Sequence, residues 1–128
     1  MLRFVVLDHD SPRGLHWDFM LERGAALRTW SLSSPPGSEP ETSAELLADH
    51  RLAYLDYEGP VAGNRGSVRR WDCGAYTVVE WSDTKIVVAL DSPKLQGAAE
   101  FILQTPDASG GPPAAQRWLL RFISASSA

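Results

Sequence analysis

The sequence has a single cysteine, Cys73, among its 128 residues. One thiol excludes an intramolecular disulfide framework and a zinc site built from several cysteines. No apolar run approaches the roughly 18 residues that are needed to span a membrane. The apolar stretch near the N-terminus, Phe4–Leu7, is also too short for the core of a signal peptide. We therefore expect a cytoplasmic protein that makes no contact with membranes.

Positive charge is scarce as well, with 12 basic against 16 acidic residues and a formal net charge of −4. This balance argues against a protein that coats nucleic acid through bulk charge. Residues 1–64 contain ten acidic and five basic side chains, which favours the first half as the place for cation chemistry. The second half brings Arg65, Arg69 and Arg70 close together, and these are either phosphate contacts or a solvated turn.

What the sequence does have is typical of an ordinary globular protein, with 44% hydrophobic and 22% charged residues. The length predicts one domain. We expect it to cover residues 1–123, with residues 124–128 as a frayed tail.

Short runs of alternating apolar and polar residues, separated by turn residues, predict strands throughout the chain. The expected strands are Arg3–Leu7, His16–Glu22, Leu27–Leu32, Ser67–Asp72, Ala75–Trp81, Lys85–Leu90, Glu100–Gln104 and Arg117–Phe122. Tight connections are expected at Gly24, Asp72–Gly74 and Ser82–Asp83. This pattern predicts an all-β fold, either a β-sandwich or a small barrel. Closure into a compact small β-barrel with short peripheral helical segments would also hide the sheet edges, and it is the fold we expect.

Two stretches rich in proline and glycine, Ser33–Pro40 and Thr105–Ala115, are predicted to be loops. The segment Glu41–His50 is ambiguous. It either begins a helix capped by Ser43 or runs as a strand into His50. We favour a short helical turn that leads into an extended segment.

The segment His16–Glu22 carries the most informative polar pattern. On a strand, alternate residues face opposite sides, so three apolar residues would share the core face: Trp17, Phe19 and Leu21. The other face would carry His16, Asp18 and Met20 along an open concave surface. Side chains two residues apart on a strand can converge on one ion.

His9 lies just upstream, across the short turn Ser11–Gly14, and supplies a third potential ligand. Two histidines and one carboxylate suit Mn²⁺, Zn²⁺ or Fe²⁺. The alternative is that His16 and Asp18 form the solvated face of a two-sided strand.

A second pair of residues, His50 and Tyr54, lies downstream. If the segment is extended, residues four apart share a face, and both side chains could enter a cleft. There they could hold a phosphate or donate a proton. The alternative for Tyr54 is a partly buried ring with its hydroxyl at the rim.

Three ordered blocks resemble the 3′-phosphoesterase domain of bacterial DNA ligase D: Phe4–Asp10, Leu15–Glu22 and Asp49–Gly59. The later segments Gly66–Tyr76, Lys94–Gly97 and Trp118–Leu120 fit the hairpin and final strands of that family. The resemblance covers nearly the whole chain. It implies a compact β-barrel with a concave active surface. It also implies a Mn²⁺-dependent enzyme that removes a terminal ribonucleoside and then a 3′-phosphate from a DNA primer strand, leaving a 3′-hydroxyl.

Transferred residue by residue, the resemblance places the family's metal ligands on His9, His16 and Asp18. Its phosphate-contacting histidine and tyrosine fall on His50 and Tyr54. The spacing argument selected the same five positions.

The sequence departs from the family pattern at several places. Met20 stands where the family has an arginine, and Ser33–Pro35 takes the place of an expected lysine. Leu7 and Ala48 replace a glutamine and a glutamate, and Gly14 lengthens the spacing between the first two histidines. The two lost cations would neutralise a phosphoryl transition state.

Four other arginines could replace the lost cations as substrate contacts: Arg13, Arg65, Arg69 and Arg70. Our first hypothesis is a Mn²⁺-dependent phosphoesterase, with Zn²⁺ as another possible metal. It would act on DNA or RNA-tailed DNA 3′ ends, alongside separate ligase or polymerase repair proteins. The alternative is a non-catalytic module that binds nucleic-acid ends or a repair partner.

Overall fold

The computed structural model describes residues 1–104 and 117–125, so the expected loop Thr105–Ala115 lies outside the described residues. The described residues form ten strands and one short 3₁₀ helix: β1 (Leu2–Ser11), β2 (Gly14–Arg23), β3 (Ala26–Leu32), β4 (Thr42–Leu46), β5 (His50–Arg51), η1 (Leu52–Leu55), β6 (Gly59–Pro60), β7 (Ser67–Trp81), β8 (Lys85–Asp91), β9 (Gln96–Leu103) and β10 (Arg117–Ser124).

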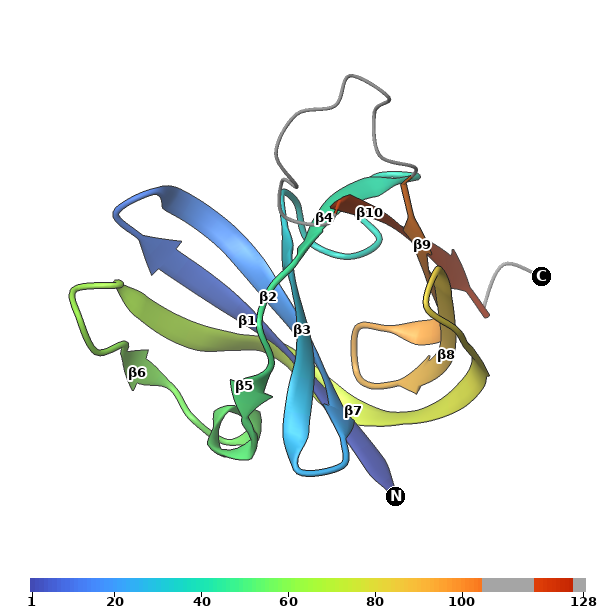
Figure 1. Cartoon of the computed structure of the whole chain (residues 1–128), viewed down its shortest axis with the longest axis horizontal. Coiled ribbons are helices and arrows are strands. Elements are labelled where there is room, and N and C mark those ends of the chain that lie inside the picture. Colours follow the sequence, from blue (N-terminus) through green and yellow to red (C-terminus); the bar gives the residue numbers. More distant parts are fainter. Residues whose placement is uncertain (105–116, 126–128) are drawn as a thin grey trace.

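Eight of the strands close into an antiparallel barrel (Figure 1), in the order β1-β2-β3-β4-β10-β9-β8-β7. Closure depends on β7, because its first half pairs with β1 and its second half pairs with β8. The two-residue strands β5 and β6 pair with β3 and β7 outside this ring. The expected all-β barrel is confirmed.

An aromatic core fills the barrel. The rings of Trp30 and Phe101 stack with their centroids 4.0 Å apart, and Phe19 meets Phe101 edge to face at 5.2 Å. Trp118 packs edge to face on Trp30, and all four side chains are buried. We call this set and its buried neighbours the barrel core.

A second apolar cluster lies on the opposite face of β1 and β2. It consists of seven buried residues, here called the outer cluster: Val5, Leu7, Met20, Leu27, Leu55, Val61 and Val68. Because strand residues alternate between faces, the consecutive buried residues Phe4–Leu7 and Phe19–Leu21 supply both clusters. Figure 1 shows β5 and β6 on the side of β1 and β2 that faces away from β8 and β9.

The turn expected at Asp72–Gly74 is wrong, because β7 runs through it without interruption. Gly74 permits a close approach instead of a turn, since a Cβ there would lie 2.2 Å from the carbonyl oxygen of Asp91. Asp72 is buried and accepts hydrogen bonds from the Ser92 hydroxyl at 2.5 Å and the Lys94 amide at 3.0 Å. These residues fasten the β8–β9 turn to the long strand.

The helical turn expected within residues 41–50 is also wrong. The segment forms β4, in which Thr42 and Ala44 are buried and Ser43 is exposed. Pairing with β10 and β3 on both sides outweighs the weak local signal for a helix cap at Ser43. Among the described residues the helical structure is limited to η1, and none of it is long and apolar enough to cross a membrane. At the other end, β10 extends to Ser124, the first residue of the expected tail.

Candidate active site

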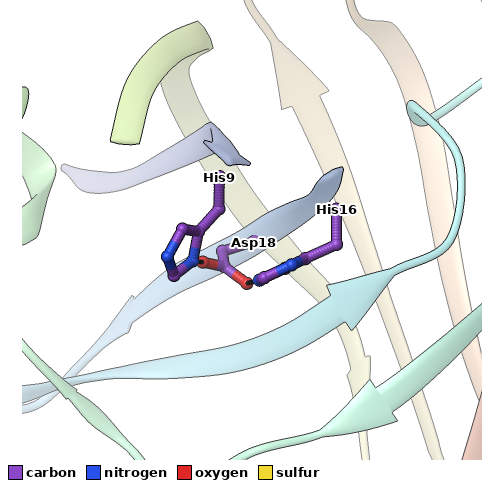
Figure 2. Close-up of side chains that lie close together, drawn as sticks. All are labelled: His9, His16 and Asp18. Carbon is purple, nitrogen blue, oxygen red and sulfur yellow. Dashed lines mark hydrogen bonds and ion pairs between the residues drawn. The ribbon is translucent and has the colours of Figure 1, made fainter. Parts of the chain in front are cut away.

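The β1–β2 hairpin brings together the three residues expected to bind metal. His9 and His16 are direct cross-strand partners, and their ring centroids lie 4.4 Å apart. Asp18 follows two residues along β2 on the same face, and one potential ligand atom from each residue lies within 4.8 Å of the others. Figure 2 shows the Asp18 carboxylate between the two imidazole rings. We call these three residues the metal group.

The Asp18 carboxylate is almost completely buried, with 3% exposure. Its Oδ2 lies 2.9 Å from Nδ1 of His9, and its Oδ1 lies 3.2 Å from Nε2 of His16. The second contact does not have hydrogen-bond geometry, and Oδ1 has no hydrogen-bond partner within the part of the chain that the structure describes. A buried carboxylate oxygen left in this state favours a cation nearby.

The other ring nitrogen of His9 is held by the backbone. Nε2 lies 2.7 Å from the carbonyl oxygen of Arg65, which can only accept, so Nε2 carries the proton. In the neutral ring, Nδ1 then directs its lone pair at the Asp18 carboxylate. Two acceptors 2.9 Å apart require a proton or a cation between them. The metal group therefore fits a divalent ion that accepts nitrogen and oxygen ligands.

The electrostatics of His16 agree with this arrangement. The contact with Asp18 raises the pKa of the imidazole above its usual value, and partial burial offsets part of the shift. The carboxylate thus stabilises positive charge at the position where an ion would lie.

A pocket of about 280 Å³ opens beside the metal group. Its lining includes His9 and Asp18, and also His50 and Tyr54 from β5 and η1. The ring centroids of His50 and Tyr54 lie 5.6 Å apart. The structure therefore places this second expected pair in the same pocket as His9 and Asp18 of the metal group. However, the reason for their proximity is not a shared extended segment, because the chain turns into η1 between them.

The floor of the pocket is apolar. Met20, Val61 and Val68 line it and belong to the outer cluster. Met20 is only 1% exposed, so the expectation that it lies on an open surface is wrong. By contrast, Phe19 and Leu21 are buried in the barrel core and Trp17 packs against it, as expected.

The four candidate arginines differ in position. Arg65 lines the pocket. Arg13 lies exposed in the β1–β2 turn, Arg69 lies 3.9 Å from Asp8, and the amide of Arg70 donates to Glu58. None of these three lines the pocket.

Two features of the site were missed at the sequence level. Arg51 lines the pocket, and its position directly after His50 was an available signal. The carbonyl of Arg65 acts through the backbone, so no residue type could have indicated it. It is positioned by Gly66, which has a φ of +85° and where a Cβ would lie 1.8 Å from the carbonyl oxygen of Asp10. Only glycine allows the loop before β7 to approach the end of β1 this closely.

The sequence of the chain is similar to a known family and to known proteins. A model of the DNA ligase D 3′-phosphoesterase domain family matches residues 7–103. The multifunctional non-homologous end joining protein LigD of Pseudomonas aeruginosa is 35% identical over 112 residues, and that of Mycobacterium bovis is 30% identical over 115 residues. These alignments cover 80% and 81% of this chain but only 13% and 15% of the two proteins. The chain thus spans a small part of the length of these relatives.

Proposed function

Because the chain belongs to the DNA ligase D 3′-phosphoesterase domain family, we propose that it is a metal-dependent phosphoesterase of DNA 3′ ends. Its substrates would carry a 3′-phosphate or a terminal ribonucleoside, and its product would be a 3′-hydroxyl. One observation carries the proposal: a single pocket is lined by two residues of the metal group, His9 and Asp18, and by His50 and Tyr54.

We assign Mn²⁺ as the metal, and Zn²⁺ is the other ion that this donor set suits. His9 and His16 would hold it through ring nitrogens and Asp18 through carboxylate oxygen. When bound, the ion supplies Lewis acidity to a phosphoryl oxygen.

His50 has a defined tautomer. Its Nδ1 lies 2.9 Å from the carbonyl oxygen of Ala48, so Nδ1 carries the proton in this hydrogen bond. Nε2 is therefore the nitrogen that, once protonated, can donate to a phosphate oxygen or pass its proton to the leaving oxygen. The Tyr54 ring, in contact with His50, would orient the same phosphate through its hydroxyl.

A second candidate function is a non-catalytic module that binds nucleic-acid ends or a repair partner. It is favoured by Met20, an apolar buried side chain where the family has an arginine. Loss of one electrostatic stabiliser of a transition state typically lowers kcat about 10²–10³-fold. Arg51 and Arg65 line the pocket and are the cations placed to replace it.

The test is incubation of a primer–template carrying a 3′-phosphate or one 3′-ribonucleotide, with and without Mn²⁺. We expect Mn²⁺-dependent conversion to a 3′-hydroxyl that is lost in His16→Ala and in His50→Ala. Val79→Ala is the control, because Val79 is 66% exposed and lies on β7, outside the pocket. Absence of conversion together with salt-sensitive end binding would favour the non-catalytic module.

The metal assignment has its own measurement. Mn²⁺ should raise Tm by mass action in the unmodified protein and in His50→Ala. The shift should disappear in His16→Ala, and a shift that persists there would remove the metal group from the proposal.

A further inference from the structure

A second hollow adjoins the pocket beside the metal group. Its volume is about 290 Å³. The two hollows share four lining residues: Arg51, Tyr54, Val61 and Arg65. The two hollows therefore adjoin, and only the first is lined by residues of the metal group, His9 and Asp18. A ligand held at the metal group could extend from the first hollow into the second.

The second hollow is positively charged and partly aromatic. Arg51 and Arg65 line it, and its lining includes no carboxylate. Within the described part of the chain neither guanidinium forms an ion pair, and only Nε of Arg65 is engaged, by donating to the carbonyl of Ala62 at 2.7 Å. Two available guanidinium groups on a protein with a net charge of −4 indicate an anionic ligand at this place.

Two tyrosine rings, Tyr54 and Tyr57, provide the aromatic part of this hollow. Tyr57 is 37% exposed, and its ring stands edge to face against Tyr54 with the centroids 5.8 Å apart. Its hydroxyl donates to the carbonyl of Pro60, which fixes the ring. An exposed, fixed ring next to arginines can stack on a nucleobase without selecting its sequence.

We propose that the second hollow binds the terminal nucleoside of the substrate strand together with the phosphate on its 5′ side. Arg51 and Arg65 hold this phosphate, and Tyr57 stacks on the base. The inference rests on the proposed function, in which the 3′-phosphate lies at the metal group. It adds that a single 3′-phosphate is a poor substrate unless a second phosphate follows one nucleoside away.

The test compares thymidine 3′-phosphate with thymidine 3′,5′-bisphosphate in the presence of Mn²⁺. Calorimetry measures the Kd of each, and phosphate release measures KM and kcat. We expect the bisphosphate to bind at least tenfold more tightly, with KM lowered and kcat for the 3′-phosphate little changed.

Single substitutions test which residues cause the tighter binding of the bisphosphate. Arg51→Ala and Arg65→Ala should each remove most of the advantage of the bisphosphate, so that its Kd approaches that of thymidine 3′-phosphate measured on the same variant. Arg69→Ala is the matched control, since Arg69 is an exposed arginine that lines neither hollow. Tyr57→Leu should weaken binding of both ligands about fivefold or more, whereas Tyr57→Phe keeps the ring and should not.

The outcomes separate this inference from the proposed function. A binding advantage that depends on Arg51 supports the inference even if no phosphate is released, in which case only the proposed function fails. Equal Kd values for the two ligands overturn it even if phosphate is released. An advantage that survives both arginine substitutions overturns it as well.

Discussion

The barrel core and the outer cluster lie back to back on the same strands, yet they differ in chemistry and in purpose. The barrel core combines aliphatic residues with large rings contributed by strands along the whole chain, such as Phe19, Trp30 and Phe101. The outer cluster is small and, apart from Met20, built from aliphatic residues, and the pocket lies over it. The strands β1 and β2 therefore contribute to two separate apolar clusters, one that fills the barrel and one that lies beneath the pocket.

Trp30→Ala should have the largest effect, because it removes a fully buried ring from the barrel core. We expect a loss of about 3–5 kcal/mol in the free energy of unfolding and a fall in Tm on the order of 10–20 °C. Leu27→Ala, on the same strand but in the outer cluster, is the comparison variant and should cost less. Urea unfolding of both variants measures the difference in the free energy of unfolding. A larger loss in Leu27→Ala would contradict the view that the barrel core stabilises the fold more than the outer cluster does.

Gly66→Ala should have the next largest effect and should act mainly on the site. The added Cβ meets the backbone of Asp10, so the loop must move and the Arg65 carbonyl must leave His9. We expect a loss of about 2–4 kcal/mol from overpacking and backbone strain. Weakening of metal binding should be about 10–100-fold, as for other groups that orient a metal ligand.

Gly63→Ala is the control for this change. Gly63 also has a positive φ, of +76°, but the nearest atom to a Cβ there lies 3.8 Å away. It should lose only about 1–2 kcal/mol and bind Mn²⁺ as the unmodified protein does. Unchanged Mn²⁺ affinity in Gly66→Ala, measured by calorimetry, would show that the Arg65 carbonyl does not position His9.

Leu55→Ala should have a smaller effect that separates the two halves of the site. Leu55 anchors η1 in the outer cluster with 5% exposure, and its truncation should cost about 2 kcal/mol. Amide hydrogen exchange over residues 50–57 should accelerate, while the Mn²⁺-induced rise in Tm is kept because the metal group lies on β1 and β2. Leu52→Ala, at an exposed position of the same helix, should change neither quantity.

Asp56→Asn should have the smallest effect and should depend on pH. The hydrogen bond and charge of Arg3 lower the pKa of Asp56 below its usual value. The pair therefore stabilises the fold above the usual aspartate pKa, and this contribution is lost as the pH falls through the lowered value. Both groups are exposed, so the effect is small. The difference in Tm between the two proteins should shrink from pH 7 to pH 3, and a constant difference would rule out the ion pair as its cause.

Alternation within short segments was sufficient to predict the all-β fold, and the spacing of polar residues selected five side chains that the structure brings close together. The alternation around His16 and the spacing to His9 follow from strand geometry alone. The burial of Met20 was not predictable in the same way, since it depends on Leu55, Val61 and Val68 from distant segments. The continuity of β7 through Gly74 likewise depends on a contact with Asp91, 17 positions further along the chain.

The pairing of His9 with His16 across a short hairpin has a consequence for how the protein folds. Hairpins form in about 1–10 μs, so the three residues of the metal group can meet before the barrel closes. His50, Tyr54 and the Arg65 carbonyl join them only when β5 has paired with β3 and β7 with β1, which are slower, long-range events. Mn²⁺ present during refolding should therefore act on the hairpin first, as a local nucleus that forms ahead of the rest of the site.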